Sequence, residues 1–147
     1  MYKLNFELVP DGCWYSNLRS ILPKNVWMEI SKDVREQAGN KCSICGNDSR
    51  RLDAHERWSY DEKNCIQKLE DVICVCSRCH SVIHIGYTQI KGNIKLAEEH
   101  FMKVNACSYS EFRVALGKAN EEHKRRNLIS EWKMDLSYFE RYVKEKD

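Results

Sequence analysis

The sequence predicts an α+β fold, with a strand-containing core between an N-terminal arm and a C-terminal helical region. Three observations support this class. There are two Cys-x-x-Cys pairs, an apolar stretch of strand length that leads into the second pair, and apolar residues at helical spacing in the last third. The 147 residues have the size of one compact domain. We expect one compact unit, in which residues 1–38 form a strand and a helix packing on the core, residues 39–90 form the core, and residues 91–147 form helices.

The N-terminal arm shows one alternating and one helical pattern. Tyr2 to Val9 alternates as a short strand does, and Pro10-Asp11-Gly12 ends it with turn residues. Residues 13–22 predict a short helical or irregular segment. A helix follows from Asn25, its expected N-cap, to Ala38, with Gly39 as its stop. The apolar residues on this helix are Val26, Trp27, Ile30, Val34 and Ala38.

The core is expected to hold two strands and the start of a helix. Residues 51–55 predict the first strand, and residues 58–67 a polar loop. The apolar run from Leu69 to Cys76 predicts a second strand. A helix is expected from Cys79 onward.

The C-terminal third is predicted to be helical throughout. Residues 88–105, 108–127 and 129–144 each carry an apolar stripe, although Gly92 weakens the first turn of the first segment. We interpret these stripes as core packing rather than ligand contacts. The last stripe comprises Trp132, Leu136, Phe139 and Val143.

The composition argues against a strongly basic or membrane-bound protein. A net charge of +2 is too small to identify a partner, so any phosphate-binding surface would be a local patch. Arg50-Arg51 and residues 123–126 are the candidates, and solvated surface charges are the alternative. There is no long apolar run and no signal-peptide pattern at the N-terminus. We therefore expect a cytoplasmic protein with no membrane partner.

The cysteine spacing predicts a metal site. In a reducing compartment closely spaced cysteine pairs hold metal more often than they form disulfides. The pairs Cys42/Cys45 and Cys76/Cys79 supply the four thiolates that a structural, tetrahedral Zn²⁺ ion needs. The other four cysteines have no partner at ligand spacing and are expected in the core: Cys13, Cys65, Cys74 and Cys107.

Three histidines predict a second site. His80 and His84 are four residues apart and would share one face of a helix, and His55 on the preceding strand would complete the set. Three imidazoles leave coordination positions open, as hydrolysis at a metal requires. His100 and His123 are isolated in the sequence and are expected to be surface or capping groups.

The order of these motifs resembles the HNH, or ββα-metal, nuclease family. The pattern C-x-x-C, L-x-x-H, polar loop, apolar strand and C-x-x-C-H-x-x-x-H covers residues 42–84, roughly a third of the chain. The whole chain is similar to a group of uncharacterised bacterial HNH-like proteins. They share its "CWYSN", "AG-x-x-C-x-x-C", "HE-x-W-x-YD" and "CH-x-x-x-H-x-G" segments.

The resemblance implies a role for each matching residue. It places His55, His80 and His84 on a catalytic divalent ion (Mg²⁺, Mn²⁺, Ni²⁺ or Zn²⁺), and Glu56 at the general-base position. Asp71 stands where the family has an asparagine that orients the base. The helix with His80 would lie against the minor groove of nucleic acid, expected to be DNA. The expected phosphate contacts are Arg51, Arg57 and Arg78.

Three roles for Glu56 follow from the HE pair. Glu56 is a substitute base in a nuclease, or an extra ligand that closes the metal site, or the mark of lost catalysis. In the last case the chain is a zinc-binding module for nucleic acid or protein, with Trp14, Tyr15, Trp58 and Tyr60 as docking residues. Beside the nuclease and the module, a third function is hydrolysis or binding of a nucleotide-derived small molecule at the same metal. The sequence leaves the oligomeric state open, a homodimer included, and does not decide whether the N-terminal strand pairs with a partner chain.

Overall fold

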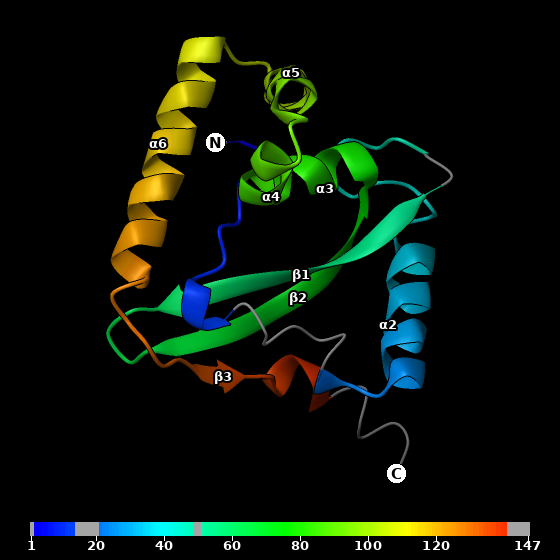
Figure 1. Cartoon of the computed structure of the whole chain (residues 1–147). Helices are drawn as coiled ribbons and strands as arrows, with labels where there is room; N and C mark the ends of the chain where they lie inside the picture. Colours follow the sequence, from blue (N-terminus) through cyan, green and yellow to red (C-terminus); the bar gives the residue numbers. More distant parts are fainter. Residues whose placement is uncertain (1, 14–20, 49–50, 141–147) are drawn as a thin grey trace.

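The computed structural model describes residues 2–13, 21–48 and 51–140 and confirms the α+β class (Figure 1). A long β-hairpin runs through the molecule, with helices against both of its faces. The described elements are η1 (Asp11–Cys13), α2 (Lys24–Gln37), β1 (Leu52–Asp61), β2 (Ile66–Cys76), α3 (Ser77–Ile83), α4 (Ile85–Ile90), α5 (Ile94–Asn105), α6 (Tyr109–Arg126), β3 (Lys133–Asp135) and η2 (Ser137–Phe139).

The hairpin is longer than predicted. β1 and β2 pair antiparallel from Leu52↔Cys76 to Asp61↔Ile66, with one bulge beside Arg57. The polar loop expected over residues 58–67 is therefore wrong, because most of it belongs to the two strands. Its charged side chains stand on the exposed outer part of the hairpin, where a strand needs no apolar alternation.

The two faces of the hairpin bury different clusters. Ala54, Val72 and Cys74 pack with Ile30 and Val34 of α2 on one face. The opposite face packs against α3, and α5 and α6 complete a second cluster there that includes Val75, Phe101 and Phe112. Because side chains alternate along a strand, Asp53, His55 and Arg57 face α3, whereas Ala54 and Glu56 face α2.

The N-terminal segment is not the strand that alternation predicted. Residues 3 and 4 form a bend, and residues 5–10 have no regular secondary structure and pair with none of the described strands. The amide of Leu4 instead donates to Asn105 Oδ1 at 3.0 Å, and Asn105 Nδ2 donates to the Leu4 carbonyl at 2.9 Å. The amide of Glu7 donates to the carbonyl of Ile83 at 2.8 Å. These contacts fix the segment against α3 and α5.

The helix boundaries differ from the predictions in three places. α2 begins at Lys24 after Pro23, without a side-chain cap from Asn25, and Gly39 follows its end with a φ of 66°. His84 ends α3 rather than lying within it, with a φ of −95° and a ψ of 52°. Gly92, at a φ of 82°, separates α4 from α5, so residues 88–105 are two helices and not one.

The last predicted helix is wrong within its described part. Residues 133–135 form β3, which pairs parallel to β2, and η2 follows. Phe139 is buried in the α2-side cluster, and Trp132 contacts the Tyr60 ring at a centroid distance of 5.4 Å. Phe139 and Leu136 thus pack in the core, as expected of the stripe, but from an irregular chain. Residues 141–144, with Val143, lie outside the described part, as do Trp14, Tyr15 and Arg50.

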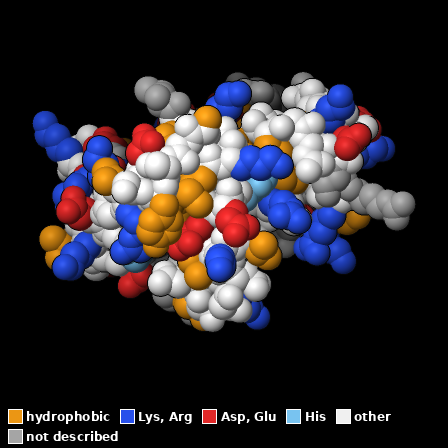
Figure 2. Space-filling model, turned by 90° about the horizontal axis from the view of Figure 1, so that it is seen from above, with side chains coloured by type: hydrophobic (Ala, Val, Ile, Leu, Met, Phe, Trp, Pro, Cys, Tyr) orange, Lys and Arg blue, Asp and Glu red, His pale blue; other side chains and the backbone are white. Residues whose placement is uncertain are grey.

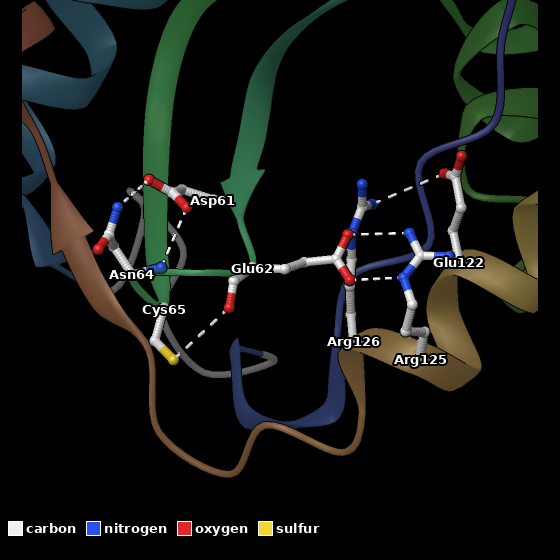
Figure 3. A network of polar contacts seen from close by, with 7 residues as sticks. All are labelled: Asp61, Glu62, Asn64, Cys65, Glu122, Arg125 and Arg126. Atoms are coloured by element: carbon white, nitrogen blue, oxygen red, sulfur yellow. Dashed lines mark hydrogen bonds and ion pairs between the residues drawn. The ribbon is translucent and has the colours of Figure 1, made fainter.

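The turn of the hairpin is fastened to the end of α6 (Figure 3). Arg125 makes two hydrogen bonds to the Glu62 carboxylate, at 2.6 and 2.9 Å. Arg126 lies 3.6 Å from the same carboxylate and 4.8 Å from the Tyr60 ring centroid. Both arginines of the basic stretch at residues 123–126 are therefore engaged within the protein and are poor candidates for phosphate binding.

Candidate metal centres

The four cysteines of the two Cys-x-x-Cys pairs lie together. Their sulfur atoms are all within 4.8 Å of one another. Cys42 and Cys45 stand in the turn after α2, and Cys76 and Cys79 where β2 meets α3. The amide of Ser43 donates to the Cys74 carbonyl at 2.8 Å and ties the first pair to β2. The cluster is compatible with a tetrahedral Zn²⁺ ion.

Local hydrogen bonds prepare the sulfur atoms for metal. The amide of Cys45 reaches Cys42 Sγ, and the amide of Cys79 reaches Cys76 Sγ, each at 3.5 Å. A hydrogen bond from the Cys79 thiol and backbone donors at Cys45, Cys76 and Ile44 lower the pKa of Cys42 to about 4. Cys42 is therefore a thiolate at neutral pH, which is the form that binds metal.

His100 belongs to this centre, contrary to its predicted surface role. Its Nε2 lies 3.2 Å from Cys79 Sγ, and burial and nearby Arg78 lower its pKa. The neutral ring can donate an N–H to the Cys79 sulfur and so offset part of the negative charge of four thiolates. This contact joins α5 to α3 across 21 residues of sequence, and no local pattern signals it.

We expect His100→Phe to release zinc to a chromophoric chelator about 10–100-fold faster than the unchanged chain. His100→Gln keeps an N–H donor and should release zinc at a rate close to that of the unchanged chain. Equal release rates for all three proteins would show that the hydrogen bond does not stabilise the bound zinc.

The three histidines form a second cluster. One ring nitrogen of each lies within 4.8 Å of the others. His55 comes from β1, His80 from α3, and His84 from the junction of α3 and α4. His55 is buried, and the other two are partly buried. Burial, with the two neighbouring histidines, lowers the pKa of His84 to about 3, so its imidazole is neutral and able to bind metal.

Two carboxylates contact these imidazoles. Asp53 Oδ2 lies 3.1 Å from His80 Nδ1. Glu7 of the N-terminal segment contacts His55 Nε2 through Oε2, and its Oε1 accepts the Trp58 amide at 3.1 Å. Carboxylates on the second ring nitrogen are typical of metal-binding histidines, since they fix the tautomer and the orientation of the ring. Sequence spacing missed both, although Asp53 stands two residues from His55 on the same strand face.

We expect Glu7→Ala to weaken binding of a divalent ion at the three histidines by about 10–100-fold. The physical reason is that His55 loses the acceptor that orients its ring. Calorimetric titration with Mn²⁺ of protein that already holds zinc at the cysteines would measure this. Glu56→Ala is the matched control and should bind like the unchanged chain; equal weakening by both changes would contradict the role of Glu7.

Glu56 is not at the three-histidine cluster. It faces α2 from the other side of β1, and its Oε2 accepts the indole N–H of Trp58 at 3.2 Å. Asp71 does lie on the His55 side, where it forms a two-pronged salt bridge with Arg57. The base role of Glu56 stays a prediction that this geometry does not support.

The predicted cations are placed differently around the histidines. Arg51 lines a pocket of about 540 Å³ together with His80, His84, Tyr87 and Lys91. Arg57 lies beside His55 in a second pocket but is held by Asp71. Arg78 lines a third pocket that contains none of the three histidines. Lys91 was not among the predicted contacts, because it stands beyond the C-x-x-C-H-x-x-x-H motif.

No family model, curated protein or solved structure matches the chain. Its fold and its two clusters define it as an α+β protein with two candidate metal centres, one of four cysteines and one of three histidines. None of the helices in the described ranges has the length and apolar character to cross a membrane.

Proposed function

We propose that the protein is an HNH-like, metal-dependent nuclease that hydrolyses phosphodiester bonds at the three-histidine centre. One observation carries the proposal: His55, His80 and His84 converge from three places in the chain beside a pocket that Arg51 and Lys91 also line. Three neutral ligands leave open positions, unlike the four cysteines.

The residues of the pocket suit a phosphate ligand. A divalent ion at the histidines would supply Lewis acidity and lower the pKa of a bound water, so hydrolysis would not require Glu56. Arg51 and Lys91 provide positive charge on the pocket wall. On the face shown in Figure 2, lysine and arginine side chains are mixed with acidic and apolar ones. Binding of nucleic acid would rest on the local cations of the pocket, since the net charge is only +2.

A second candidate function is a non-catalytic zinc-binding module. Two observations favour this module. Glu56 faces α2, and Asp71 is paired with Arg57, so neither carboxylate is placed for proton transfer at the histidines. The aromatic residues proposed for docking give it little support. Tyr60 contacts Trp132 and Arg126, and Trp58 packs at the edge of the α2-side cluster.

The two functions are separated by a cleavage assay. Zinc-loaded protein is incubated with supercoiled plasmid, single-stranded DNA and RNA in Mg²⁺, Mn²⁺, Ni²⁺ or additional Zn²⁺. The nuclease proposal expects cleavage with at least one ion, and cleavage that survives Glu56→Ala. Binding without cleavage under every condition would favour the module.

A further inference from the structure

Tyr87 is an exposed aromatic residue in the wall of the pocket that contains His80 and His84. It is 63% exposed, although α4 is anchored by its neighbours. Ile85 is buried, and the Thr88 hydroxyl donates to the Ser81 carbonyl at 2.6 Å. The helix thus holds the ring at the pocket rather than in the core.

Lys91 stands beside this ring. It follows Tyr87 by one helical turn, and its Nζ lies 5.5 Å from the ring centroid. Arg51 lines the same pocket from the start of the hairpin. An aromatic face and two cations therefore border the histidines, and Arg51 Nε lies 3.7 Å from Asp53 Oδ1 in the same lining. The remaining lining is polar: Ser77, Ser81, Thr88 and Asn93.

An aromatic ring flanked by cations matches the chemistry of an unpaired nucleotide. Proteins bind single strands by stacking bases on aromatic rings while cations follow the phosphates. In a duplex each base is already stacked and paired, so the ring gains little there. A purely apolar partner would cover the charged groups of the pocket without offering them a polar contact.

We propose that the pocket binds single-stranded nucleic acid, with one unpaired base stacked on Tyr87 and flanking phosphates near Lys91 and Arg51. This inference rests on the proposed function, because it places the scissile phosphate at the histidines. It adds a preference for single strands over duplexes and names the residue that sets it.

Fluorescence anisotropy with labelled phosphorothioate oligonucleotides, which resist hydrolysis, tests the preference. The full chain and its variants are titrated onto a single strand and onto the duplex of the same sequence at one salt concentration. Tyr87→Ala should weaken single-strand binding by about 5–100-fold and leave duplex binding unchanged. Tyr87→Phe keeps the ring and should bind like the unchanged chain. Tyr109→Ala removes an exposed tyrosine of α6 outside the pocket and should also have no effect.

The outcomes separate the two proposals. If the unchanged chain cleaves nucleic acid but Tyr87→Ala binds single strands normally, or loses single-strand and duplex binding equally, only the stacking role is overturned. If the unchanged chain neither binds nor cleaves any oligonucleotide, the proposed function and this inference both fail.

Discussion

Cys42→Ser is expected to abolish zinc binding at the cysteines and to remove most of the stability of the domain. Three of the four cysteines belong to the buried cluster that packs against α3, α5 and α6. Without the ion, burial raises the pKa of Cys45 and the hydrogen bond with Cys42 raises the pKa of Cys79, so protonated thiols would replace the metal bonds that join the two cysteine pairs. Zinc contributes about 10–16 kcal/mol to the folding of zinc-finger peptides, which equals or exceeds the total stability of a typical domain.

Metal analysis and thermal unfolding followed by circular dichroism would measure this effect. Cys107→Ser is the matched control, because Cys107 is half-buried and stands outside both metal clusters. It should keep one zinc per chain and a melting temperature close to that of the unchanged chain. A Cys42→Ser protein with full zinc content and an unchanged melting temperature would refute the four-thiolate site.

His80→Ala is expected to lower the rate of the proposed phosphodiester cleavage by more than about 100-fold. Mutation of residues that only hydrogen-bond to metal ligands already lowers metal affinity or activity by about 10–100-fold, and loss of a ligand should cost more. His80 is only partly buried, so the fold should tolerate the change. Single-turnover cleavage of a labelled oligonucleotide at saturating Mn²⁺ would measure the rate. His123→Ala is the control, because His123 is not part of the three-histidine cluster. Its Nε2 lies 3.2 Å from the Val9 carbonyl oxygen instead. Equal rates for the two variants would contradict a catalytic centre at the histidines.

The parts of both clusters were predictable from sequence because the spacing within each part is local. That the cysteine pairs would meet, although Cys45 and Cys76 are 31 residues apart, was inferred from the four ligands that zinc needs. A Cys-x-x-Cys turn brings two sulfur atoms together by itself, and four residues of helix do the same for His80 and His84. The contacts of Glu7 with His55 and of His100 with Cys79 join residues 48 and 21 positions apart. Only the packing of the N-terminal segment and of α5 creates them, so no spacing rule reports them.

The position of Glu56 shows what a strand assignment adds. Placed on a strand, adjacent residues point to opposite faces, so His55 and Glu56 cannot both face α3. The family resemblance implies that Glu56 is the general base, whereas the alternation of side chains along the strand points Glu56 away from the histidines.

The predicted helix over residues 129–144 failed for a related reason. Its apolar stripe identified Leu136 and Phe139 as core residues correctly, but they pack there from η2 and the residue before it and not from the predicted helix.

The most direct test of two separate metal centres is a count of bound ions by native mass spectrometry. The unchanged chain, saturated with Zn²⁺, is predicted to hold two ions, and His80→Ala to hold one. A single ion on the unchanged chain, or two ions on His80→Ala, would contradict the three-histidine centre.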